Sequence, residues 1–318
     1  MDLIVAVRTI HIGASVIAAG AFAFGFLVWP REPQADEVRE AMSRWLRRSA
    51  AWSASIALLT WIVWLALIAA TMAAASPNLE VLKTVLARTN FGHVWMLRFA
   101  LGLLVLIELR TRRSATASAA PHAFGTVAAL LFLMSLAWAG HAVGSQGALR
   151  ALHLTVDALH LLGAGLWLGA LLPLCFVLQR ARAAATSPWL TAASAATTNF
   201  SSLGVIAVLT IAASGVVNTS LQVDTLAALV QTQYGQLVSA KIALLALIVA
   251  LAGYNRLRLV PKLQAGGADA ERDSVAGLYR NALLELVLGA AIIAIVGLLG
   301  NMAPASHLHE EGMQHMSH

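Results

Sequence analysis

Eight long apolar stretches determine what this chain can fold into. Each is long enough to cross a bilayer as a helix, and 59% of the 318 residues are hydrophobic while only 11% are charged. Because backbone N–H and C=O groups find no water inside a bilayer, such stretches have to be helical. The sequence therefore predicts an all-α polytopic membrane protein, a bundle of about eight transmembrane helices. The expected spans are 4–29, 49–75, 92–110, 122–141, 151–178, 197–219, 236–259 and 281–302.

The loops between these stretches differ in positive charge. Fifteen of the 21 Lys and Arg residues follow the first, third, fifth and seventh spans, and loops rich in these residues stay in the cytoplasm. Both termini are then predicted to lie outside, which in a bacterial inner membrane is the periplasm. Since the charge serves orientation, the expected partner is the lipid bilayer and not nucleic acid. The fifteen are Arg31, Arg39, Arg44, Arg47, Arg48, Arg110, Arg112, Arg113, Arg180, Arg182, Arg256, Arg258, Lys262, Arg272 and Arg280.

The chain is expected to form one domain with a short tail. The connecting loops are short, so residues 1–303 are predicted to be a single transmembrane helical domain. The first apolar stretch has no basic segment before it and is long enough to span, which indicates a retained helix and not a cleaved signal peptide. Residues 304–318 are predicted to be a His/Met-rich periplasmic tail, a composition typical of metal capture.

Histidine is unevenly distributed relative to this predicted orientation. Nine of the ten histidines fall on the periplasmic side or in the outer half of the bilayer, and only His122 falls on the cytoplasmic side. The single cysteine, Cys175, allows no thiolate cluster, and imidazole with thioether is a ligand set suited to copper. The candidate metal ligands are His11, His93, Met96, His141, His153, Asp157, His160, Met302, His307, His309, Met313, His315, Met316 and His318.

The segment LHLTVDALH, residues 152–160, places a carboxylate and two imidazoles in an apolar span. At about 100° per residue, His153, Asp157 and His160 fall within about 60° of one another and form one stripe, which Trp167 continues. The two imidazoles are on the order of 10 Å apart along the axis, since each residue rises ~1.5 Å. They cannot both ligate one ion in an unbroken helix, so the stripe favours a ladder of sites.

The carboxylate of this stripe has more than one interpretation. Asp157 could be a ligand, or it could accept a hydrogen bond that orients His160. It could also form a structural ion pair with Arg98 or Lys241, because an isolated charge is costly in a membrane.

A second carboxylate lies deeper in the predicted bundle. Glu285, near the inner end of the last span, could be an exit-side ligand or a proton acceptor. It could equally bond to Asn255 or Arg256, and the sequence leaves these interpretations open.

From the fourth span onward the chain resembles a known family, the bacterial copper resistance protein CopD (PcoD). Several unlike motifs occur in the family's order and spacing, whereas the first three spans match mainly by length and by the placement of His11 and His93. The motifs are AGHA at 139–142, DALHLLGAGLWLGALLPL at 157–174, NFSSLGVIAVLTIAASGVVNT at 199–219, QTQYGQLVSAKIALL at 231–245, YNRLRLVP at 254–261, Leu283–Glu285 and LGNMAPA at 299–305.

The resemblance implies an inner-membrane copper transport protein that moves copper from the periplasm to the cytoplasm. It also implies a small periplasmic copper-binding partner, CopC, and it matches the family's Tyr-Gly-Lys pattern to Tyr234, Gly235 and Lys241. The chain has no P-loop and no phosphorylation motif of a copper ATPase, so transport would be passive or ion-coupled and no enzymatic activity is expected. A homodimer is compatible with these features.

These observations lead to one preferred hypothesis and two alternatives. In the preferred one, the tail and an outer rim capture copper, as Cu(I) or Cu(II), and a set of intramembrane residues passes it inward. In the first alternative, facing histidines clamp a b-type haem in a redox protein with a Trp-lined quinone pocket. In the second, a sensor or assembly factor binds copper without transporting it. The rim is His93, Met96, His141 and Met302, the inward path is His11, His153, Asp157 and His160, and the candidate axial haem ligands are His11, His93, His141 and His160.

Overall fold

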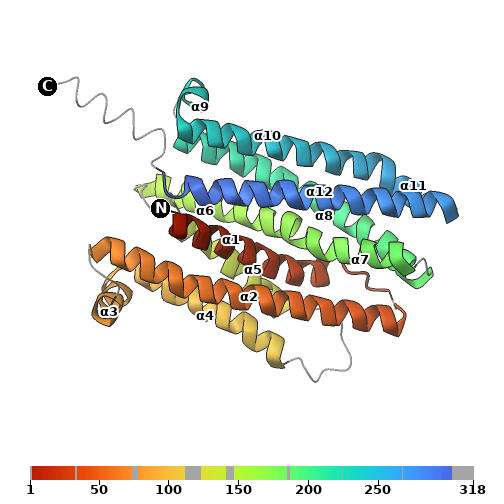
Figure 1. Ribbon diagram of the computed structural model, residues 1–318, viewed down its shortest axis with the longest axis horizontal. Helices are drawn as coiled ribbons and strands as arrows, with labels where there is room; N and C mark the ends of the chain where they lie inside the picture. Colours follow the sequence, from red (N-terminus) through yellow and green to blue (C-terminus); the bar gives the residue numbers. More distant parts are fainter. Residues whose placement is uncertain are drawn as a thin grey trace.

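The computed structural model is a bundle of long helices that run up and down beside one another (Figure 1). It describes residues 2–32, 34–73, 78–111, 123–140, 147–184, 187–223, 225–266 and 268–302, and all regular structure within these ranges is helical. Seven helical runs are long and apolar enough to cross a membrane, and an eighth, Ala123–Ala139, is shorter. The predicted all-α polytopic membrane fold is confirmed.

The helices follow the predicted spans but several extend beyond them. Helix α2 starts well before residue 49, because acidic side chains in its first turn favour a helix N-terminus and because Arg44 bonds to Glu40 one turn away. The elements are α1 (Asp2–Ala23), η1 (Phe24–Val28), α2 (Asp36–Ala73), α3 (Leu79–Arg88), α4 (Asn90–Thr111), α5 (Ala123–Met134), η3 (Ser135–Ala139), α6 (Gly147–Ala164), η5 (Gly165–Gly169), α7 (Ala170–Ala184), α8 (Ser187–Gln222), α9 (Ala228–Gln231), α10 (Gln233–Tyr254), η6 (Asn255–Leu259), α11 (Val260–Ala265) and α12 (Ala268–Leu299).

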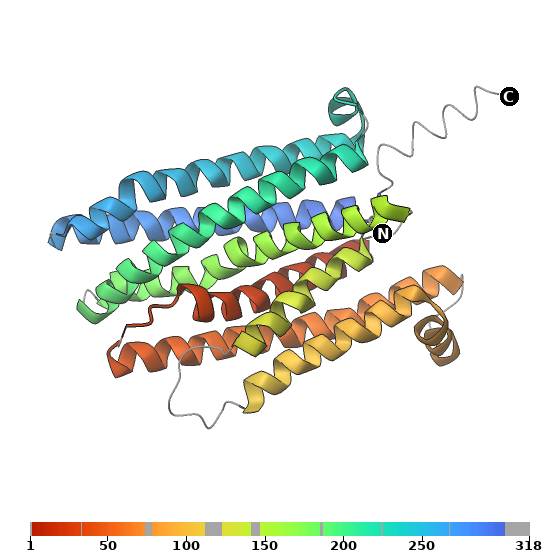
Figure 2. The same ribbon diagram turned by 180° about the vertical axis from the view of Figure 1, so that it is seen from behind.

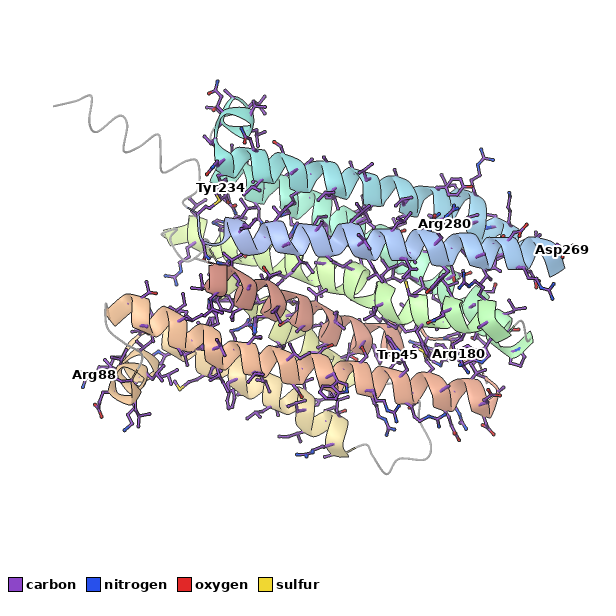
Figure 3. All side chains as sticks on the ribbon, in the orientation of Figure 1. Trp45, Arg88, Arg180, Tyr234, Asp269 and Arg280 are labelled. Atoms are coloured by element: carbon purple, nitrogen blue, oxygen red, sulfur yellow. The ribbon has the colours of Figure 1, made fainter. Side chains whose placement is uncertain are left out.

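The two ends of the bundle differ in charge. We call the end where α1 starts and α12 finishes the terminal end, and the opposite end, where α2, α8 and α12 start, the basic end. Figure 3 places Arg180 and Arg280 toward the basic end and Arg88 and Tyr234 toward the terminal end. The described members of the fifteen basic loop residues therefore gather at one end, as the sequence predicts.

Helix α1 lies at the centre of the bundle. It packs against α2 and α5 on one side and against η5, α7 and α12 on the other. Figures 1 and 2 both show α1 between α2 and the pair α6 and α12. Helix α1 therefore makes much of the contact between the N-terminal and C-terminal halves of the chain, and α5 and η3 add to it by packing against α6.

The closest approach in this centre is made by two glycines. A Cβ placed on Gly20 of α1 would lie 1.9 Å from the carbonyl carbon of Gly169 in η5, and one placed on Gly169 would lie 2.2 Å from the carbonyl oxygen of Val16. These separations are far below van der Waals contact, so only glycine fits on either side. Small residues allow such close backbone contact between membrane helices, where dispersion forces stabilise the pair.

We predict that Gly20→Ala destabilises the protein by about 1–3 kcal/mol or more, because the added methyl group has to push two backbones apart. The matched control is Gly13→Ala on the same helix, where a Cβ would meet nothing within 4 Å. Thermal unfolding in detergent checks this expectation. Equal transition temperatures for the two variants would show that the crossing is looser than described.

Candidate functional site

Among the groups of polar side chains inside the described bundle, two contain histidines. The first, the His11–Arg98 cluster, consists of His11, Thr60, Arg98 and Ser135 and lies in the N-terminal half. The second, the α6 line, consists of the predicted stripe His153, Asp157 and His160 together with Asn218 and Ser214 of α8. The two groups differ in whether the nitrogen and oxygen atoms that could bind a metal already form hydrogen bonds.

His11 has both ring nitrogens bonded. Its side chain is 0% exposed; Nε2 lies 2.7 Å from Nη2 of Arg98, and Nδ1 lies 2.9 Å from the carbonyl oxygen of Ala57. A guanidinium only donates hydrogen bonds, so Nε2 accepts, and Nδ1 carries the proton that it donates to the carbonyl. His11 is therefore a neutral imidazole without a free lone pair, and its predicted role as a copper ligand would require the bond to Arg98 to break.

Arg98 is also fully buried, and its charge is dispersed over neutral partners. Nη1 donates to the hydroxyl of Ser135 at 2.8 Å, and the guanidinium lies 5.7 Å and 5.3 Å from the ring centres of Trp95 and Phe132. Among the described residues, no carboxylate forms an ion pair with it. Arg98 is thus bonded to His11 and not to Asp157, the partner that the sequence allowed.

Asp157 is the charged member of the α6 line. It is half-buried and accepts a hydrogen bond at 3.3 Å from Nδ2 of Asn218, whose own Oδ1 is buried without a partner in the part of the chain that is described. Lys241 and Arg8 are the basic side chains whose charge acts on Asp157, but neither comes within the 4 Å of an ion pair. An acceptor oxygen without a donor therefore lies beside a carboxylate, which is an arrangement suited to a cation.

His160 keeps one nitrogen free of hydrogen bonds to described side chains. Its Nδ1 lies 2.9 Å from Oγ of Ser214, and this hydroxyl is 2.5 Å from the carbonyl oxygen of Thr210, to which it donates. With the hydroxyl donating to Thr210, Nδ1 donates to Ser214 and Nε2 carries the lone pair. The ring lines a small cavity of about 80 Å³ that also borders Lys241, Trp167 and Glu285.

Glu285 lies on the far side of this cavity and is only 2% exposed. Its Oε1 accepts from Nδ2 of Asn255 at 2.9 Å, and Oδ1 of Asn255 accepts from Nδ2 of Asn281 at 2.7 Å. Of the two bonding partners that the sequence left open, Asn255 is the one observed, whereas Arg256 donates to the carbonyl and the hydroxyl of Ser201.

The other predicted ligands do not join the α6 line. His93 and Met96 are exposed on α4 in the N-terminal half, and Met302 packs against an apolar cluster that includes Val223 and Leu299. No group of three or more His, Cys, Asp or Glu that could hold a metal ion occurs among the described residues. These assignments stay predictions. His141 and the tail residues His307, His309, Met313, His315, Met316 and His318 lie outside the described residues.

Several partners of these residues were not predicted from the sequence. Ser214 orients His160, while Arg8 donates to the carbonyl of Gly300 at 2.6 Å and lies 5.4 Å from the ring centre of Trp64. Tyr234 donates to Gln222 close to the same end. A polar residue within an apolar span was the available signal, but the contact partner depends on how the helices are paired.

We predict that His11→Leu destabilises the protein by about 3–5 kcal/mol, because it leaves the buried charge of Arg98 without its imidazole acceptor. The double variant His11→Leu/Arg98→Met should lose much less, since the charge is removed together with its partner. Thermal unfolding in detergent measures both. A double variant that is no more stable than the single one would contradict this account of the cluster.

Two family models match successive parts of the chain. The model of "Copper resistance protein D" matches residues 194–299, and that of "Copper resistance protein D-like, N-terminal domain" matches residues 1–152. No solved structure matches.

Two curated relatives cover most of the chain. "Copper resistance protein D" of Pseudomonas syringae pv. tomato is 31% identical over 259 residues, which is 79% of this chain and 82% of that protein. "Inner membrane protein YebZ" of Escherichia coli (strain K12) is 31% identical over 218 residues, which is 68% of this chain and 70% of that protein. The chain belongs to the copper resistance protein D family.

Proposed function

We propose that this protein carries copper through a bacterial inner membrane, from the periplasm toward the cytoplasm, along the α6 line. One observation carries the proposal: the unpartnered Oδ1 of Asn218 lies beside the carboxylate of Asp157, one turn of α6 from a histidine whose Nε2 keeps its lone pair. Oxygen ligands and a neutral imidazole in succession give a cation a route through helices that are otherwise apolar.

The sidedness follows from charge. The basic end carries most of the Lys and Arg of the loops, which favours a cytoplasmic location. The terminal end then faces the periplasm, and His153 and Asp157 are met before His160 by an ion that enters there. The inner membrane is supported by the name of the relative from Escherichia coli.

No group of three or more metal-binding side chains is preassembled among the described residues, and this suits a protein that passes copper on better than one that stores it. An ion moves through a membrane protein only when each site binds it strongly enough to enter and weakly enough to leave. Sites of one or two ligands each, spaced along α6, meet this requirement. The charges of Lys241 and Arg8 offset Asp157 while copper is absent, and an arriving ion takes over that role.

Capture takes place at the terminal end. The tail, with four His and two Met residues, gathers the ion there. A small periplasmic copper-binding protein of the CopC kind supplies the copper.

Copper uptake into proteoliposomes tests the path. We expect Asp157→Asn to lower the initial rate by about 10–100-fold, because the amide lacks the charge that offsets the ion. The matched control is Asp269→Asn at the exposed start of α12, which should leave uptake unchanged.

Two outcomes would contradict the proposal in different ways. Wild-type protein that takes up no more copper than empty liposomes would leave the copper sensor or assembly factor as the better hypothesis. Full uptake by both Asp157→Asn and His160→Gln would remove the α6 line from the path. An absorption spectrum of the purified wild type tests the haem alternative in the same preparation, because bound haem gives a Soret band.

The tail can be tested separately. A variant of the same length in which Ser replaces the four His and two Met residues of 307–318 should bind copper more weakly in a titration with the intact protein. Its uptake should fall at low copper concentration and approach that of the wild type at high concentration. Identical titrations for the two proteins would show that the tail has no role in capture.

A further inference from the structure

Glu285 is a buried carboxyl group that the proposed copper path does not use. It lies in the middle of α12, in a membrane-spanning run, and its described hydrogen-bond partners, Asn255 and Trp167, are neutral. A carboxylate in a membrane is costly unless its charge is offset or removed by a proton. The side chains and cavities around Glu285 show which of these applies.

Glu285 and Trp167 separate two cavities. The smaller, of about 80 Å³, reaches His160 and Lys241, and the larger, of about 210 Å³, extends past Asn255. The larger cavity is lined mostly by apolar side chains, and its polar groups lie nearer the basic end. Besides Asn255 and Glu285 they are Thr197, Ser201 and Arg256, and the buried hydroxyl of Thr197 has no partner in the described part of the chain.

Two irregular helical segments border Glu285. Trp167 lies in η5 and Asn255 lies in η6, and both segments are single π-helical turns within longer helices. Such turns widen a helix locally and expose backbone carbonyls, and they occur frequently at functional sites. Both π-helical turns of this half of the bundle therefore lie next to the carboxyl group of Glu285.

The charged and titratable neighbours of Glu285 come from four elements. His160 of α6 and Lys241 of α10 share its smaller cavity, and Arg256 of η6 shares the larger one. Cys175 of α7 is a further titratable neighbour. None of these forms an ion pair with Glu285, and no hydrogen bond joins it to His160, among the described residues.

We propose that Glu285 binds a proton when the smaller cavity is empty and releases it when copper reaches that cavity beside His160. This inference rests on the proposed function and adds a proton-linked gate to it. The O–H bond of the carboxylic acid breaks, the proton leaves through the larger cavity to water, and the carboxylate that remains offsets the charge of the ion. No electron is transferred, so the oxidation state of copper is unchanged.

The first test uses purified protein in weakly buffered detergent solution with a pH indicator. Addition of copper ion should release protons from the wild type in excess of those released by buffer alone. Glu285→Gln should reduce that excess without removing it, because copper binding to the histidines of the tail releases protons as well. The matched control is Glu108→Gln, which removes a carboxyl group from α4 in the other half of the bundle and should behave as the wild type. Equal proton release by the wild type and Glu285→Gln would overturn the inference.

The second test needs no variant, so it also holds if Glu285→Gln fails to fold. An infrared difference spectrum of the wild type with and without copper should lose the carbonyl band of a protonated carboxylic acid. An unchanged band would overturn the inference. Neither test measures transport, so wild-type protein that takes up copper in liposomes without proton release would refute only the gate, and proton release without uptake would refute only transport.

Discussion

The contact between Gly20 and Gly169 determines how the two halves of this protein meet. Without a hydrophobic driving force between helices in lipid, close backbone approach supplies the packing energy. Gly169 is two residues from Trp167, so the same contact that holds α1 against η5 also sets the position of a side chain that borders both cavities. The crossing of two helices therefore fixes the geometry of the candidate path.

The two polar groups on either side of this contact use their charges differently. Arg98 is surrounded by an imidazole, a hydroxyl and two aromatic rings, which stabilise the charge and leave no bonding capacity on His11. In the α6 line, Asn218 keeps an unused acceptor and His160 keeps a lone pair. The first arrangement is complete without a ligand and the second is not. The physical difference favours a structural role for the first and an ion path for the second.

The helices and the stripe on α6 could be predicted from sequence because both depend on local periodicity. Hydropathy predicted the spans, and the 3.6-residue repeat placed His153, Asp157 and His160 on one face. The partner of His11 could not be predicted, since Arg98 is 87 residues away and their contact depends on how α1 and α4 both pack against α2 and α5. The contacts of Ser214 and Asn218 with α6 could not be predicted for the same reason, because they depend on the register between α6 and α8, which no local pattern encodes.

A path built from incomplete sites requires a way to offset charge at each step. At Asp157 the basic groups Lys241 and Arg8 are already present, so an entering ion competes with them for the carboxylate. At Glu285 no ion pair exists among the described residues, and a proton is the smallest charge that can occupy the carboxyl group. The charge of Asp157 is thus offset by nearby basic side chains, whereas the charge of Glu285 is removed by a proton. Past His160 the route relies on the ion or a proton to neutralise the acid, because Lys241 and Arg256 border the two cavities but form no ion pair with Glu285 among the described residues.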